Sequence, residues 1–117
     1  VENRPHVSLE DGIRKVILEM SGGRLGAVAV TDESGHLLGI ITDGDLRRML
    51  EKYQDVDPLR AKDIMSASPK TISEEELAYN AFQKMEQNSI TQLVVVGEEN
   101  VYKGMVHIHD ILREGVV

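Results

Sequence analysis

The chain has 117 residues, 41% hydrophobic and 28% charged, which is enough for one globular domain with an aliphatic core. Its net charge of −7 argues against a nucleic-acid partner, because a broad phosphate-binding surface needs an excess of Lys and Arg. The absence of cysteine excludes disulfides and thiolate zinc sites and favours a cytoplasmic protein, and no apolar run approaches the roughly 18 residues of a membrane span. Because the chain begins with Val and not Met, we expect a piece of a longer protein.

The first half of the chain predicts an extended segment, a helix, two strands and a second helix. Ser8 and Asp11 have the spacing of a helix capping box, and apolar residues then recur at helical spacing from Ile13 to Met20. The elements expected in chain order are an extended segment near 5–7, a helix from about 8 to 20, strands at 27–30 and 38–42, and a helix from 45 to about 52.

The second half predicts the same elements in the same order. Ser73 and Glu76 repeat the capping-box spacing, and apolar residues again follow at helical spacing up to Met85. The expected elements are an extended segment near 70–72, a helix from about 73 to 85, strands at 93–96 and 103–107, and a helix from 110 to about 115.

A shift of 65 residues superposes the two halves. The identities at this offset are Ser8 with Ser73, Glu10 with Glu75, Met20 with Met85, Gly39 with Gly104 and Asp45 with Asp110. A half of about 55 residues is a poor independent fold, so we expect the two repeats to pack together by pseudo-twofold symmetry. We therefore divide the chain into repeat 1 (residues 1–52), a linker (residues 53–69) and repeat 2 (residues 70–117).

Two short motifs carry a resemblance to a known family. The strand-to-helix junction Gly-Ile-Ile-Thr-Asp-Gly-Asp at 39–45 and the linker string Asp-Ile-Met at 63–65 resemble a tandem pair of cystathionine-β-synthase (CBS) repeats. The resemblance implies an α/β (α+β) fold of two β-α-β-β-α repeats. It also implies a regulatory, ligand-sensing role without catalytic residues, and no required cofactor.

A closer resemblance involves residues 42–48 and 106–113. These strings are similar to the C-terminal regulatory region of bacterial D-arabinose-5-phosphate isomerases. That resemblance implies a covalently attached N-terminal sugar isomerase domain and a place in Kdo and lipopolysaccharide biosynthesis. The chain itself would not be an enzyme.

The first candidate ligand site lies at the start of the helix that follows the 38–42 strand. Thr42 and Asp45 have capping-box spacing, so the spacing alone leaves a structural cap and a ligand site equally open. By the family resemblance, Thr42 and Asp45 would hold a nucleotide ribose, and Arg47 is a candidate phosphate contact. The resemblance also assigns to this site Arg60, Met65, Ile90 and Thr91. Met65 and Ile90 would enclose a base or, equally, pack in the core.

The second candidate site departs from the family pattern, because His107 replaces the expected hydroxyl. The residues that the resemblance assigns to it are Arg24, Leu25, Gly26, His107, His109 and Asp110. Gly26 would let a ligand approach the backbone closely. Three interpretations of the histidines stay open: contact with an anion or sugar-nucleotide, a structural cap or subunit contact, and, least favoured, a metal held by His107 and His109.

These observations favour a regulatory module that binds a nucleotide or nucleotide-sugar. CMP-Kdo is the preferred ligand, as the end product that feedback logic selects for such a pathway. The alternatives are an adenine-nucleotide sensor and a ligand-free module that forms a homodimer or tetramer. The surface expected for such association comprises Met49, Leu50, Ile111 and Leu112.

Overall fold

The computed structural model describes residues 4–23 and 26–113. Repeat 1 contains β1 (His6–Ser8), α1 (Ile13–Gly23), β2 (Ala27–Thr31), β3 (Leu37–Thr42) and α2 (Asp43–Lys52). The linker adds α3 (Ala61–Ile64) and β4 (Ser66–Ala67). Repeat 2 contains β5 (Thr71–Ser73), α4 (Ala78–Gln87), β6 (Gln92–Val96), the 3-10 turn η1 (Glu98–Asn100), β7 (Tyr102–His107) and α5 (Ile108–Arg113). None of the helices in the described ranges combines the length and apolarity needed to cross a bilayer.

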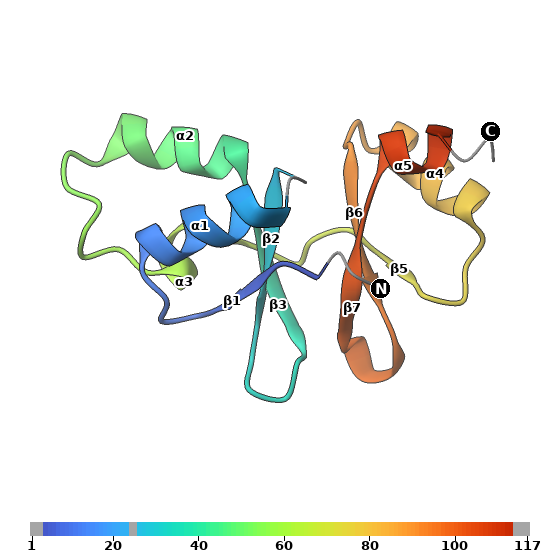
Figure 1. Ribbon diagram of the computed structural model, residues 1–117, viewed down its shortest axis with the longest axis horizontal. Helices are drawn as coiled ribbons and strands as arrows, with labels where there is room; N and C mark the ends of the chain where they lie inside the picture. The colour runs from blue at the N-terminus through green and yellow to red at the C-terminus, as the bar shows by residue number, and fades with distance from the viewer. Residues whose placement is uncertain (1–3, 24–25, 114–117) are drawn as a thin grey trace.

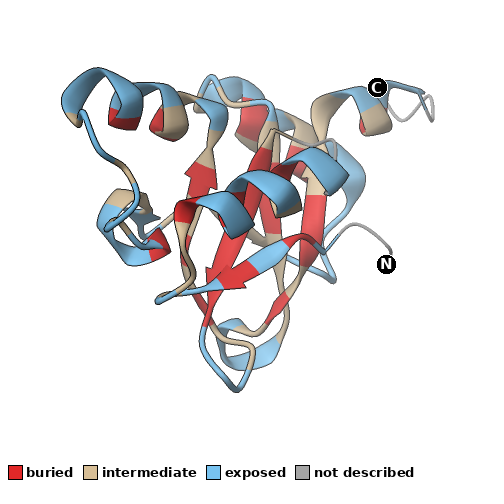
Figure 2. Cartoon of the chain, turned by 60° about the vertical axis from the view of Figure 1, so that its left-hand side comes forward, coloured by how far each residue is buried: buried red, intermediate tan, exposed pale blue. Residues whose placement is uncertain are grey.

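Two sheets stand side by side at the centre of the molecule, with the helices of each repeat on the outside (Figure 1). One sheet has the strand order β1-β2-β3-β4 and the other β5-β6-β7. The strands carry most of the buried surface (Figure 2). The interface between the sheets is formed by Ala27, Ala29, Leu37, Val94, Tyr102 and Met105. Both repeats contribute to this cluster, so neither sheet completes its core alone.

The two repeats share one strand register. Ala27 pairs with Thr42 in repeat 1, and Gln92 pairs with His107 in repeat 2, both at the offset of 65 residues. The irregularity that follows Val30 in β2 recurs after Val95 in β6. The predicted β-α-β-β-α repeat is therefore confirmed down to the pairing of individual residues.

The helix starts differ from the sequence expectation. Ser8 and Ser73 end strands β1 and β5 and do not cap helices, and α1 and α4 begin five residues after them. The backbone nitrogen of Asp11 donates to the carbonyl of Ser8 (3.1 Å), and Glu76 makes the same bond to Ser73 (3.0 Å). A serine followed by an acid favours such a turn as much as a helix cap, because its side chain bonds nearby backbone in both. The predicted caps at these two positions were wrong.

The linker contributes a short helix and a strand to repeat 1. β4 pairs antiparallel with β3, with Gly39 opposite Ala67 and Ile40 opposite Ser66. Ala61, at the start of α3, is fully buried in the core of repeat 1. The linker thus forms the fourth strand and one wall of the first repeat.

Candidate functional site

Thr42 and Asp45 form a complete capping box at the start of α2. The backbone nitrogen of Asp45 donates to Thr42 Oγ1 (3.3 Å), and the backbone nitrogen of Thr42 donates to Asp45 Oδ2 (2.9 Å). The Thr42 hydroxyl also donates to Asp45 Oδ2 (3.2 Å). The buried Asp45 carboxylate is therefore held in one orientation, with Oδ2 directed at the helix start.

The second carboxylate oxygen of Asp45 accepts from Arg48. The distance from Arg48 Nη2 to Asp45 Oδ1 is 2.7 Å, and the Arg48 side chain is 66% exposed. Arg113 makes the equivalent contact to Asp110 in repeat 2. The sequence interpretation proposed Arg47, which is exposed to solvent, as a phosphate contact and did not single out Arg48 as the partner of Asp45. The repetition of Arg48 as Arg113 at the offset of 65 was the signal that could have identified it.

The Asp45 side chain lines a cleft between α2 and the linker. This cleft has a volume of about 130 Å³, and Asp63 and Ile64 of the Asp-Ile-Met string line its other side. Of the linker residues assigned to this site, Met65 packs against the core of repeat 1. Arg60 precedes α3 and pairs with Gly12 before α1. The structure thus places Asp45 across a cleft from the Asp-Ile-Met string. The residues of the string that line this cleft are Asp63 and Ile64, and not the predicted Met65.

A second group of residues meets at the seam between the repeats, where β2 and β6 begin. Gly26 has a φ of +69°, and a Cβ added there would lie 2.9 Å from Asp43 Oδ2 and 3.2 Å from Gln92 Nε2. The backbone angle favours glycine at this position, and a larger residue would also displace the ends of the Asp43 and Gln92 side chains. Sequence reasoning predicted a role for Gly26 but did not single out Asp43 or Gln92. Asp43 meets Gly26 only when β2 and β3 pair within repeat 1, and Gln92 meets it only when the two repeats pack.

Thr91 joins the same seam from repeat 2. Its hydroxyl donates to Gln92 Oε1 (3.1 Å), and its carbonyl accepts from the backbone nitrogen of Ile108 (2.8 Å). The carbonyl of Gly26 accepts from the nitrogen of Asp43 in the same way (3.1 Å), so Gly26 and Thr91 occupy equivalent positions. Ile90, also assigned to the first site, packs on the core of repeat 2. Arg24 and Leu25, assigned to the second site, lie outside the described residues.

His107 and His109 stack at the start of α5. Their ring centroids are 4.8 Å apart, and the backbone nitrogen of His109 donates to His107 Nδ1 (3.1 Å). Burial, reinforced by the neighbouring His109, lowers the pKa of His107, while Asp110 opposes this shift. Across residues 4–23 and 26–113, no group of three or more His, Cys, Asp or Glu side chains is arranged to hold a metal ion.

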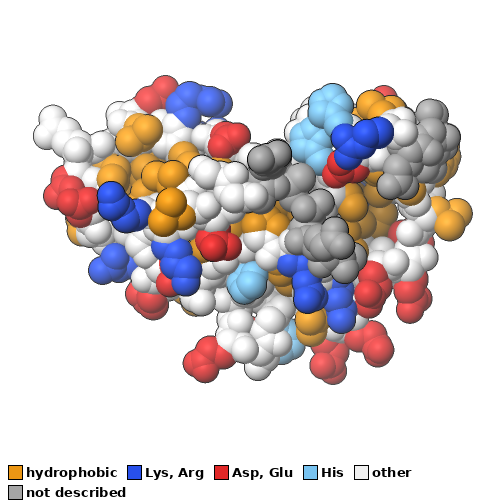
Figure 3. All heavy atoms as spheres, in the orientation of Figure 1, with side chains coloured by type: hydrophobic (Ala, Val, Ile, Leu, Met, Phe, Trp, Pro, Cys, Tyr) orange, Lys and Arg blue, Asp and Glu red, His pale blue; other side chains and the backbone are white. Residues whose placement is uncertain are grey.

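The starts of α2 and α5, one in each repeat, lie at the same end of the molecule (Figure 1). Figure 3 shows the surface hollowed between the start of α2 and the start of α5, with histidine side chains gathered over α5. Each side carries an aspartate paired with an arginine, and the imidazoles are added on the side of repeat 2. Such an arrangement can accept hydrogen bonds from a diol on the first side and donate to an anion on the second.

The pattern of the CBS domain family matches residues 2–52 and 61–116. Arabinose 5-phosphate isomerase KdsD of Pseudomonas aeruginosa is 40% identical over 116 residues, 99% of this chain and 36% of that protein. KdsD of Francisella tularensis is 43% identical over 109 residues, 93% of this chain and 33% of that protein. The chain thus spans about a third of the length of these curated relatives.

Among solved structures, the CBS domain protein PAE2072 from Pyrobaculum aerophilum, complexed with AMP, is 27% identical. The two superpose with a TM-score of 0.78, covering 96% of this chain and 92% of that one. The duplicated strand register and the shared core between the sheets are consistent with these similarities, since all of them indicate a tandem pair of repeats. This chain belongs to the CBS domain family as a tandem pair, homologous over nearly its whole length to the CBS region of arabinose 5-phosphate isomerases.

Proposed function

We propose that this CBS pair is a regulatory module that binds a nucleotide or nucleotide-sugar between its repeats and controls an attached arabinose-5-phosphate isomerase domain. The observation that carries the proposal is the similarity to two such isomerases, which covers almost all of this chain and about a third of each relative. A module of this kind regulates only if the ligand binds two arrangements of the protein with different affinity.

CMP-Kdo is the ligand we favour, because the pathway end product is the compound that feedback control would sense. Asp45 would accept hydrogen bonds from ribose hydroxyls, with the exposed Arg48 side chain leaving Oδ1 to make room. His107 and His109 would donate to the phosphate or the sugar-acid carboxylate on the other side of the hollow.

An adenine nucleotide is the second candidate, and the AMP bound by the Pyrobaculum aerophilum relative favours it. The Asp45 and seam residues would serve either nucleotide, because both contain a ribose diol. The histidine pair distinguishes the candidates, since CMP-Kdo carries an additional carboxylate for it to bind.

A ligand-free association module is the third candidate. Leu50 and Leu112 are exposed and could contribute to such a surface. Met49 and Ile111 are buried, so that part of the predicted surface was wrong: these side chains are needed in the cores of their own repeats.

Calorimetric titration of the chain with CMP-Kdo, CMP, AMP and ATP tests the proposal. We expect saturable binding of CMP-Kdo that weakens at least about tenfold in Asp45→Ala, since a hydrogen bond to a charged group contributes about 1.5–3 kcal/mol. The matched variants Asp110→Ala and His107→Ala report the other side of the hollow. Each variant is first checked by circular dichroism for an intact fold.

The outcomes separate the three candidates. Binding of AMP or ATP without CMP-Kdo would replace the feedback role with an adenine-nucleotide sensor. No heat from any of the four compounds, with the protein folded, would contradict both ligand-binding proposals and leave association as the function to pursue.

A further inference from the structure

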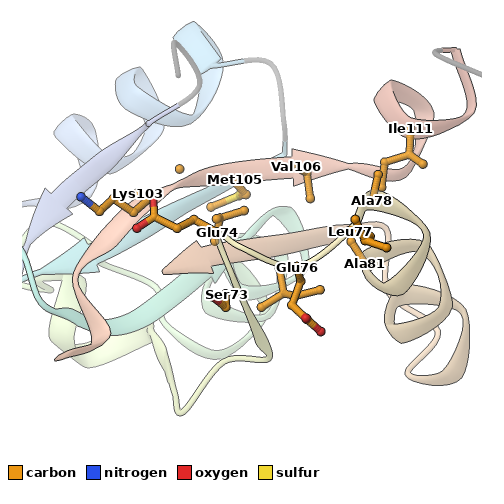
Figure 4. A pocket seen from close by; sticks show the side chains of 13 residues that line it. Ser73, Glu74, Glu76, Leu77, Ala78, Ala81, Lys103, Met105, Val106 and Ile111 are labelled. Carbon is orange, nitrogen blue, oxygen red and sulfur yellow. The ribbon is translucent and has the colours of Figure 1, made fainter. Parts of the chain in front are cut away.

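The cavities outside the seam differ in chemistry. One is an apolar cavity of about 350 Å³ in repeat 2, where Leu77, Ala78, Ala81 and Ile111 group on the helix side (Figure 4). Another, of about 160 Å³, lies where β2 ends and β7 begins, next to the turn between β2 and β3. We call it the hairpin pocket, and its lining residues are Arg4, His6, Thr31, Gly35 and Tyr102. Its polar lining makes it the better candidate for recognising a ligand.

The hairpin pocket is formed between the two sheets. Side chains alternate along a strand, so Thr31 lies on the opposite face of its sheet from Val30, which is buried in the core of repeat 1. Val7 is buried in the same core, which places His6 on the face that carries Thr31. That face is turned toward Tyr102 of the other sheet. Two polar side chains thus stand at the end of an interface that is otherwise apolar.

The Thr31 hydroxyl is the feature that a purely structural role does not explain. Thr31 is 5% exposed, and its side chain forms no hydrogen bond with the residues that the structure describes. Among those residues, no fully enclosed side-chain oxygen or nitrogen lacks a partner, so the Thr31 oxygen must reach the pocket that the residue lines. A hydroxyl buried without a partner costs free energy. The counterpart in repeat 2 is Val96, which packs on the inter-sheet core without this cost.

Arg4 and His6 bring donors and positive charge to the same pocket. His6 Nδ1 donates to the backbone carbonyl of Arg4 (3.0 Å), and the His6 ring meets the edge of Tyr102 with 6.3 Å between centroids. Nε2 is the remaining nitrogen of the ring, and it donates when the imidazole is protonated. Burial raises the pKa of Tyr102 and the positive charge of Arg4 opposes this rise, so the guanidinium acts close to the Tyr102 hydroxyl.

The charge of Arg4 is not neutralised by a neighbouring acid in the described ranges, where Arg4 forms no ion pair. Asp32, which follows Thr31, is engaged in its own turn. Its carboxylate accepts from the backbone nitrogens of Ser34 (2.9 Å) and His36 (2.8 Å) and contacts the His36 ring (3.1 Å). The pocket therefore combines a cation with donors and has no acidic side chain in its lining.

We propose that the hairpin pocket binds a phosphate group, carried by inorganic phosphate or by a small phosphomonoester. Arg4 would donate to two phosphate oxygens, and Thr31 and protonated His6 would donate to the others. A tetrahedral oxyanion offers acceptors in all these directions, whereas Arg4 alone would satisfy a planar carboxylate. The pocket is smaller than the roughly 300 Å³ at which sites for drug-sized ligands begin, so it admits a phosphate group and not a whole nucleotide.

Titrations followed by nuclear magnetic resonance test the proposal, with inorganic phosphate and arabinose 5-phosphate added separately in a phosphate-free buffer. We expect saturable shifts of the backbone amides of Thr31, Gly35 and Tyr102. Arg4→Gln should weaken binding at least about tenfold, because it removes charge-assisted hydrogen bonds. Whichever of the two compounds binds more tightly identifies the source of the phosphate group.

Thr31→Val copies repeat 2 and separates the functional from the structural role of the hydroxyl. It should weaken phosphate binding about threefold to tenfold, because one neutral hydrogen bond is lost. It should also raise the midpoint of thermal unfolding by about 3 °C, because the unpartnered hydroxyl is removed. A lower midpoint together with unchanged phosphate affinity would assign the hydroxyl to the fold and overturn the proposal.

Arg14→Gln is the matched control, because it removes the same charge from an exposed position on α1 and should leave the affinity unchanged. A loss of affinity in Arg14→Gln as large as that in Arg4→Gln would show a response to net charge alone and overturn the proposal. Shifts confined to the starts of α2 and α5 would place the phosphate in the seam, with the same consequence. The absence of saturable shifts at the amides of the hairpin pocket also overturns it.

Discussion

The two repeats have the same strand register but differ in how completely they are closed. Val30 of repeat 1 is fully buried, whereas its counterpart Val95 is partly exposed and lines the cavity of repeat 2. The difference comes from the linker, which covers the first repeat and not the second. The closure of repeat 1 therefore depends on the linker that precedes repeat 2, and not on the sequence of repeat 1 alone.

Matched truncations of Val30 and Val95 measure this difference directly. Val30→Ala should lower the free energy of unfolding by about 2–3 kcal/mol, because it leaves a cavity in closed packing. Val95→Ala should cost about 1 kcal/mol, because its side chain already borders open space. Urea denaturation of both variants makes the measurement.

Met20→Ala and Met85→Ala provide the control. These counterparts are both buried, so their losses of stability should be similar. Equal costs for the valine pair as well would show that the repeats are equally closed in solution, and would contradict the comparison.

The cap of α2, the last helix of repeat 1, offers a test with a smaller expected effect on stability. Thr42→Ala removes the hydroxyl that accepts from the backbone of Asp45 and should cost about 1 kcal/mol of folding free energy. Thr42→Ser keeps the hydroxyl and should lose much less. A cost in Thr42→Ser as large as that in Thr42→Ala would assign the effect to packing of the Thr42 methyl group and not to the cap.

The smallest expected effect is a pH dependence of stability that comes from His107. Repeat 1 has Thr42 at the equivalent position, which does not titrate. Folding lowers the His107 pKa from its ordinary value of 6.5, mainly through burial, so the unfolded chain binds this proton more tightly. The resulting stability is present above pH 6.5 and is lost as the pH falls below it. His107→Thr, which copies repeat 1, should flatten the decline in unfolding midpoint between about pH 7 and pH 5. An unchanged decline would assign it to other groups.

Much of the fold followed from local pattern. The alternation of apolar runs and turns predicted β2, β3, β6 and β7 to within one or two residues, because strand formation depends on short-range composition. The helix starts predicted at Ser8 and Ser73 were wrong, because a local pattern does not distinguish a turn from a helix cap. The same short-range bonds serve both, and tertiary packing decides between them.

The candidate site was less accessible to sequence reasoning. Thr42 and Asp45 were identified because their spacing has a local meaning, and the structure shows the capping box that this spacing predicted. Asp43 and Gln92 were not singled out, because Asp43 meets Gly26 only when β2 and β3 pair, and Gln92 only after the two sheets have packed.

The sequence by itself determined the duplication, the shared register and the family, because all three are encoded in periodicity and in short motifs repeated at one offset. Only the tertiary structure decided that the linker covers repeat 1, and that β7 pairs on one side only within the described part of the chain. That choice depends on contacts between segments far apart in the chain. Such contacts arise from three-dimensional packing, which the order of residues within either repeat does not record.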